Sequence, residues 1–301
     1  AMVSLLLETW RYFSSHDGRL LSGAIAFYAA LAIAPLGVVA LLIASLVMSE
    51  TEAREELVGQ LDVFLGTEMA TFVVDSIVAL TDQAASYAAP ILGALFMLYV
   101  SARLFSMLRR ALNHMWGIRP KLFVHATRSE KRHLIQRRML AFAMVLVFGS
   151  SLIALVLLHS SASAAAHFFG DNTYTLTLAE FASAFAVLAP LIALVYRWLP
   201  DAEIAWRDVW VGAAATCFLV LVGSFLIGIY LGQVSPASVY GVAGSLIVLL
   251  LWIYYTTQIF LMGAVFTRAW ARRRGRAIEP LPYADIVETR DYSAKVSASE
   301  T

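Results

Sequence analysis

The sequence has little charge and a single cysteine. Only 14% of its 301 residues are Asp, Glu, Lys or Arg, and 60% are hydrophobic, whereas a soluble domain is about 45–50% apolar. Cys217 stands alone, which excludes a disulfide within the chain. Between Val209 and Thr267, 59 consecutive residues carry no charge. Because one membrane crossing needs about 20 apolar helical residues, this composition excludes a soluble globular protein and predicts a membrane protein.

The sequence also lacks the patterns that carry common enzyme chemistry. Its six histidines are dispersed, without the spacing of about three to five residues that metal ligands on one helix turn need. It contains no phosphate-binding glycine loop and no nucleophile elbow. We therefore expect no metal, no cofactor and no enzymatic activity, and any transport would run without nucleotide hydrolysis by this chain.

Uncharged windows of spanning length predict an all-α membrane protein, a bundle of six transmembrane helices within residues 1–275. The predicted spans are residues 22–48, 84–108, 139–159, 176–198, 209–231 and 241–268.

The basic residues are distributed asymmetrically between the predicted loops. With six spans, 21 of the 22 Lys and Arg residues fall on one side of the membrane. Cytoplasmic segments retain positive charge, so both termini and the second and fourth loops are predicted to face the cytoplasm. Five or seven spans would scatter the basic residues over both faces.

The longest outer segment, residues 50–83, has apolar residues at helical spacing and eight acidic residues against Arg54 alone. This pattern predicts amphipathic helices. Helices that lie on anionic lipid are usually basic, so we favour packing across the outer mouth of the bundle over lying flat on lipid. Residues 276–301 lack an apolar period and are predicted to form a flexible cytoplasmic tail.

The basic second loop, from Arg109 to Arg138, has three interpretations. It can set the topology, contact anionic phospholipid head groups or bind nucleic acid. No nucleic-acid-binding fold or aromatic stacking pattern accompanies it, so nucleic acid is not an expected partner.

Polar residues within the spans are candidates for a translocation groove. Arg103 in span two can snorkel to the interface or point into an inner cavity. Span six carries an unusual block of polar aromatic, hydroxyl and amide side chains, which can serve hydrogen bonds between helices or line a groove. The candidate groove residues are Arg103, Arg109, Asn113, Trp252, Tyr254, Tyr255 and Gln258.

Small residues and prolines suggest where the helices pack and bend. Gly228 and Gly232 form a pair that permits close helix packing, within the monomer or across a homo-oligomer. Pro35 and Pro190 each remove an intrahelical hydrogen bond and are predicted to kink their helices, as hinges or as static features.

Several motifs in order along the chain resemble the YihY/BrkB family of bacterial inner-membrane proteins. They are AFYAALAIAPL (26–36), ALNHMWG (111–117), LPD (199–201), WRDV (206–209), YG (240–241), LLWIYY (250–255) and GAVF (263–266). The resemblance covers nearly the whole chain, from about residue 20 to residue 274. One departure is Ala32-Ile33-Ala34, where the family motif usually has a serine and a bulky residue before the proline.

The resemblance implies a six-span inner-membrane protein linked to envelope integrity, to serum resistance and to proposed lipid export or flipping. An older ribonuclease label of the family finds no support, because the histidine and aspartate cluster of a zinc nuclease is absent. The leading hypothesis is movement of a membrane phospholipid or lipid-like anion between leaflets. The rivals are a scaffold that binds envelope partners through its outer helices, and a channel, which the scarcity of ionisable residues at mid-membrane disfavours.

Overall fold

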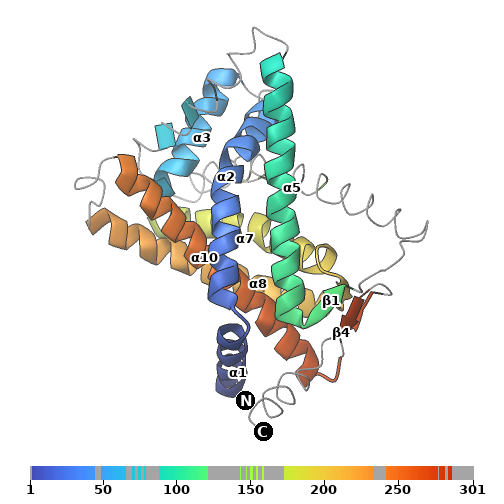
Figure 1. Ribbon diagram of the computed structural model, residues 1–301. Helices are drawn as coiled ribbons and strands as arrows, with labels where there is room; N and C mark the ends of the chain where they lie inside the picture. The colour runs from blue at the N-terminus through green and yellow to red at the C-terminus, as the bar shows by residue number, and fades with distance from the viewer. Residues whose placement is uncertain are drawn as a thin grey trace.

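The computed structural model describes residues 2–44, 49–65, 88–120, 173–233, 242–276, 278–281 and 284–286. It also describes single positions between residues 70 and 78 and between residues 143 and 158. The protein is mainly helical, as predicted (Figure 1). Its helices are α1 (Met2–Ser15), α2 (Gly18–Ala44), α3 (Glu50–Leu65), α5 (Ala88–Trp116), α7 (Thr173–Trp198), α8 (Trp206–Gln233) and α10 (Val242–Arg273).

Five of the six predicted spans coincide with long helices, namely α2, α5, α7, α8 and α10. Within the described residues, three helices are long and apolar enough to cross a membrane, at Phe181–Trp198, Trp206–Leu226 and Leu249–Arg273. A shorter apolar helical stretch is found at Gly18–Ala32. Most of the predicted third span lies outside the described residues, so the count of six remains a prediction.

Local signals define several helix ends. The α3 helix begins with a reciprocal capping box, in which the Ser49 amide donates to Glu52 Oε2 (2.9 Å) and the Glu52 amide donates to Ser49 Oγ (3.3 Å). These hydrogen bonds hold the pKa of Glu52 below its usual value. At the ends of α5 and α10, Gly117 and Gly275 both adopt φ 70°, the left-handed conformation that glycine adopts without strain.

Helix α10 is the central element, since it packs against α1, α2, α5 and α8. Helices α7 and α8 pack side by side, and α2 packs along α5 (Figure 1). Helix α3 lies at the end of the molecule opposite α1, where it contacts α2, α8 and α10. Its packing across the outer mouth of a six-helix bundle remains a prediction.

Four short strands connect segments that follow α5, α7 and α10. Strand β1 (Ile118–Pro120) pairs with β4 (Ala284–Ile286), and β2 (Ala202–Glu203) pairs with β3 (Glu279–Pro280), both antiparallel. The Leu281 amide also donates to the Asp201 carbonyl oxygen (3.1 Å). Within the predicted flexible tail, residues 279–280 and 284–286 instead form strands, because their backbone groups pair with distant segments. Residues 287–301 lie outside the described residues.

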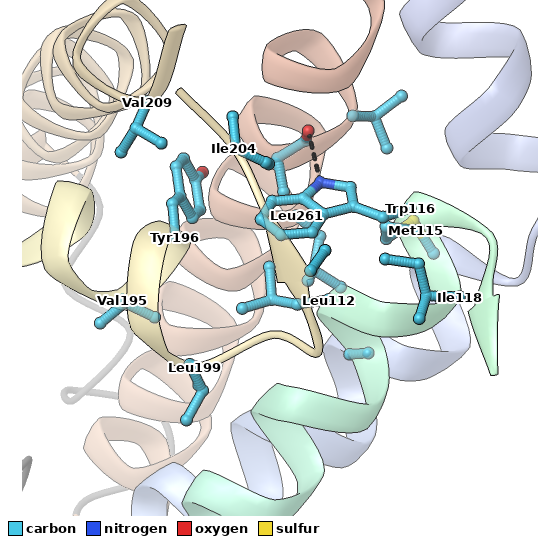
Figure 2. Packing of buried hydrophobic residues seen from close by; sticks show 14 of the residues in the cluster. Leu112, Met115, Trp116, Ile118, Val195, Tyr196, Leu199, Ile204, Val209 and Leu261 are labelled. Carbon is cyan, nitrogen blue, oxygen red and sulfur yellow. Dashed lines mark hydrogen bonds between the residues drawn. The ribbon is translucent and has the colours of Figure 1, made fainter. Parts of the chain in front are cut away.

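The main apolar core lies where α5, α7, α8 and α10 meet (Figure 2). Trp116 and Tyr196 are its largest buried side chains. The Trp116 indole Nε1 donates to the Ala264 carbonyl oxygen (2.9 Å), and the Tyr196 hydroxyl donates to the Phe260 carbonyl oxygen (2.6 Å). Both polar tips thus find acceptors on α10, so the two large side chains are buried without an unsatisfied donor.

Two glycines allow α8 and α10 to approach closely, and they do so reciprocally. A Cβ atom at Gly212 would overlap the side chain of Thr267, and one at Gly263 would overlap Thr216. Each threonine hydroxyl donates to a carbonyl of its own helix, Thr216 to Gly212 (2.7 Å) and Thr267 to Gly263 (2.8 Å). Each glycine thus makes room for a threonine of the other helix, while the hydroxyls remain satisfied inside apolar surroundings.

The packing and hinge residues predicted from the sequence remain untested. Gly228 and Gly232 fall within α8, but their surroundings lie outside the described side chains. Pro35 and Pro190 fall within α2 and α7, and the helical assignment runs through both positions.

We expect Gly212→Ala to lower the unfolding free energy by about 1–3 kcal/mol, because the added methyl group overpacks the α8–α10 contact. Gly59→Ala is the matched control. No atom lies within 4 Å of a Cβ built at Gly59 on α3, and alanine there should stabilise the helix by up to about 1 kcal/mol. Thermal unfolding of the purified protein in mild detergent measures both. Equal melting temperatures for the two variants would contradict the close approach.

Candidate functional site

Helix α5 carries a polar, cationic stripe on its exposed face. The stripe, here called the α5 stripe, consists of exposed residues spaced by three or four positions: Tyr99, Ala102, Arg103, Ser106, Arg110 and His114. Its length is about 22 Å at the rise of an α-helix. The opposite face is buried and apolar, with Phe105, Leu112 and Met115 in the core. A membrane helix that exposes such a stripe presents positive charge along an otherwise apolar surface.

Among the described residues, the two arginines of the α5 stripe contact groups of their own helix. Arg103 Nε donates to the Tyr99 hydroxyl (3.1 Å), and its guanidinium carbon lies 5.1 Å from the centre of the Tyr99 ring. Arg110 Nε donates to the Ser106 carbonyl oxygen (3.3 Å). In the described part of the chain, neither arginine has a carboxylate partner. Their charges are therefore available to an anion.

The neighbouring groove candidates Arg109 and Asn113 have a different role. Arg109 forms a two-point ion pair with Asp201, in which Nε lies 3.1 Å from Oδ2 and Nη2 contacts Oδ1. Asn113 Nδ2 donates to Asp201 Oδ2 (2.7 Å), and Asn113 Oδ1 accepts from the Asp201 amide (2.8 Å). Asp201 is 2% exposed. Arg109 and Asn113 thus hold a buried carboxylate in the connection between α7 and α8, and their place in a translocation groove remains a prediction.

Three more buried or half-buried charged groups lie near this end of α5 and α10. Asp208 is 1% exposed, and Arg276 Nη1 donates to both of its carboxylate oxygens (3.1 and 3.0 Å). Arg268 donates to the Met115 carbonyl oxygen (3.2 Å) and lies 4.4 Å from the centre of the Tyr12 ring. Together with the Arg109–Asp201 pair, these contacts tie α1, α5, α8, α10 and the connection between α7 and α8 into one polar cluster.

The sequence did not predict that Asp201, Asp208 and Arg276 form ion pairs. Both aspartates belong to motifs that carry the family resemblance, LPD and WRDV, and this was the available signal. Their partners lie 92 and 68 positions away in the sequence, a separation that no local pattern identifies.

Of the polar residues predicted in span six, which form part of α10, some pack against α2 and others are exposed. Tyr254 and Trp252 pack against a small cluster formed by Ala26, Leu249 and Ile253, at the seam between α2 and α10. Tyr255 is exposed, and its ring centre lies 5.6 Å from that of Tyr254. Gln258 is partly buried. Tyr254 thus serves the contact between helices, whereas Tyr255 faces outward.

His16, which lies near the polar cluster, has a pKa below its usual value. His16, in the turn between α1 and α2, stacks on Tyr12 with 3.8 Å between ring centres, and its Nδ1 lies 3.0 Å from the Tyr12 carbonyl oxygen. Burial lowers the pKa of His16, and the nearby His114 and Arg268 lower it further. Among the described residues, no three His, Cys, Asp or Glu side chains are arranged to hold a metal ion.

Comparisons with known proteins point to one family. The family model described as virulence factor BrkB matches residues 9–285. A UPF0761 membrane protein of Chromobacterium violaceum is 29% identical over 266 residues, which cover 85% of this chain and 59% of that protein. A UPF0761 membrane protein of Verminephrobacter eiseniae is 38% identical over 84 residues, which cover 28% of this chain and 20% of that protein.

A third similar protein, a UPF0761 membrane protein of Delftia acidovorans, is 29% identical over 163 residues, or 52% of this chain and 36% of that protein. This chain therefore spans less than two thirds of the length of each of these relatives. No solved structure matches it.

We expect Asp201→Asn to lower the unfolding free energy by about 3–5 kcal/mol, because it leaves the Arg109 charge without its partner in a buried site. Asp75→Asn is the matched control. It breaks the ion pair of Asp75 with Arg54, whose side chains are 52% and 41% exposed, and such exposed pairs contribute about 0–1 kcal/mol. Equilibrium unfolding in mixed micelles compares the two variants. A loss at Asp201 no larger than that at Asp75 would show that the cluster does not stabilise the fold.

We expect His16 to make the fold less stable in mild acid. Its pKa is lowered in the folded state, so its favourable contribution is present above the unfolded pKa of about 6.5 and is lost as the pH falls. The measurement is the melting temperature at about pH 5 and about pH 8 for the wild type and His16→Gln. The wild type should lose more stability on acidification than the variant; equal losses would exclude this role.

Proposed function

The chain belongs to the BrkB virulence factor family, and proteins similar to it are named membrane proteins; from this premise we propose that it moves, or helps to move, a lipid or other amphipathic anion between the leaflets of the bacterial inner membrane. Such movement would support the integrity of the envelope, which the family resemblance implies. The observation that carries the proposal is the α5 stripe.

An anionic head group cannot cross the apolar layer of a bilayer without partners for its charge. Arg103 and Arg110 of the α5 stripe offer such partners, since neither is bound to a carboxylate among the described residues. Guanidinium groups suit this task because they bind phosphate or carboxylate through two parallel hydrogen bonds. The head group would thus follow the stripe while its acyl chains stay in lipid.

The spacing of the two arginines suits a stepwise path. They are seven positions apart on one helix face, which separates them by about 10 Å along the axis. The exposed side chain of Ser106 lies between them in the stripe, and Tyr99 extends it beyond Arg103. In this proposal Arg110 replaces Arg109 as the second cationic group of the path, because the Asp201 carboxylate already neutralises the charge of Arg109.

Exposed residues on the neighbouring helices fit a path at the lipid boundary. Helix α2, which packs along α5, exposes Phe27 and Leu31, and these apolar side chains are suited to contact acyl chains. On α10, Tyr255 is exposed and Gln258 is partly exposed. Two predictions complete the proposal: both termini lie in the cytoplasm, and the Arg110 end of the stripe faces the inner leaflet.

A second candidate function is a scaffold that does not transport. It rests on α3, which lies across α2, α8 and α10 and exposes Glu52 and Glu55. A scaffold would bind an envelope partner through this acidic helix, and the arginines of the α5 stripe would then have no effect on its activity.

We expect the double variant Arg103→Gln/Arg110→Gln to slow lipid movement by about tenfold or more, because a hydrogen bond to a charged group contributes about 1.5–3 kcal/mol and 1.4 kcal/mol is a factor of ten. The protein is reconstituted into liposomes that contain a fluorescent anionic phospholipid. A membrane-impermeant reductant then reports the rate at which label from the inner leaflet becomes accessible.

The control is Arg272→Gln, which removes an exposed arginine at the end of α10 that is not part of the α5 stripe. This variant should retain the wild-type rate. A wild-type rate no higher than that of empty vesicles would overturn the transport proposal and favour the scaffold. An active wild type with an equally active double variant would overturn the role of the α5 stripe alone.

A further inference from the structure

Helix α1 presents three chemically different faces, and one of them is apolar and uncovered. Its first face packs on the protein: Leu5, Thr9 and Phe13 are buried, and the helix contacts α10 and α2. In Figure 1, α1 lies at the end of the molecule opposite α3.

The second face of α1 is polar and borders water. Ser4, Glu8, Arg11 and Ser15 follow one another at helical spacing and, with Tyr12 and with Leu7 at its apolar edge, line an open groove of about 460 Å³. Arg273 donates to Glu8 Oε2 (3.0 Å) and to Ser4 Oγ (3.2 Å) from the end of α10. These exposed hydrogen bonds are of the kind that a solvated surface supports.

The third face consists of Val3, Leu6, Leu7 and Trp10, which are 70%, 54%, 52% and 47% exposed. At about 100° per residue, these four positions lie within an arc of about 100° on the helix circumference. No polar residue interrupts the arc between Val3 and Trp10. A continuous apolar face of this kind is unfavourable in water and calls for an apolar neighbour.

The position of α1 in the chain identifies that neighbour. Only a two-residue turn, His16 and Asp17, separates α1 from α2, and Leu20 at the start of α2 is 73% exposed. Helix α1 therefore leads directly into a helix that covers one of the predicted membrane crossings and that also exposes an apolar side chain at its start. Arg19 lies beside this face, with its guanidinium carbon 5.6 Å from the centre of the Trp10 ring. Trp and Arg side by side are typical of the layer between lipid head groups and acyl chains.

We propose that α1 is an interfacial helix that binds the lipid of the protein's own membrane through Val3, Leu6, Leu7 and Trp10. Its buried face packs against α2 and α10, and its polar face is solvated. Its apolar face lies at the boundary between head groups and acyl chains. This surface is separate from the α5 stripe, and the proposal does not depend on transport.

The test uses the full chain in proteoliposomes, with Cys217→Ser to remove the native thiol. A spin label is attached through Leu6→Cys on the apolar face or, as matched control, through Arg11→Cys on the polar face of the same helix. Collisions with oxygen, which concentrates in acyl chains, and with a water-soluble nickel chelate are compared. The ratio of oxygen to nickel accessibility should be several-fold higher at position 6 than at position 11.

Two results would overturn the proposal. Equal nickel accessibility at the two positions would place the third face in water. Shielding from both reagents at position 6, with spin–spin broadening that disappears on dilution with unlabelled protein, would show that a second copy of the chain covers the face.

A second measurement needs no attached label, so it remains possible if the cysteine variants do not fold. The fluorescence difference between the wild type and Trp10→Phe isolates the emission of Trp10, which phospholipids brominated near the head-group end of the acyl chain should quench. Trp10 emission that is insensitive to these lipids would also overturn the proposal.

Discussion

The buried carboxylate of Asp201 is the constraint on which this end of the molecule depends. A carboxylate at 2% exposure is tolerated only when its charge and lone pairs are matched. Arg109 supplies the charge and Asn113 two hydrogen bonds, so the end of α5 and the connection between α7 and α8 must keep one relative position. The Asp201 carbonyl then receives the Leu281 amide, which brings the chain after α10 to the same place. The Arg276–Asp208 pair repeats this arrangement at the start of α8.

Five arginines of the described residues differ in what they contact. Arg109, Arg268 and Arg276 reach acceptors on other elements, so they join distant segments of the chain. Among the described residues, the printed partners of Arg103 and Arg110 belong to their own helix, and both side chains are exposed. The first three arginines therefore stabilise the fold, whereas Arg103 and Arg110 are the better candidates for binding an anion.

The sequence predicts the helices well because apolar length and charge distribution are properties of single segments. The positions of α2, α5, α7, α8 and α10 follow from uncharged windows alone. It predicts the site less well: from composition, Arg109 and Arg110 are equivalent neighbours, yet one is paired in the interior and the other is exposed. Only the contact with a residue 92 positions away distinguishes them. The strands near the end of the chain were missed for the same reason, since two or three residues carry no periodicity and their partners are remote.

The pairing of β1 with β4 and of β2 with β3 has a consequence for biogenesis. Each ladder joins two segments that lie far apart in the chain, and in both the later partner follows α10. The Arg109–Asp201 pair can link the end of α5 to the connection between α7 and α8 as soon as residue 201 has been made. The two ladders can form only after translation of α10, so they are a late step in assembly that adds to a contact already available.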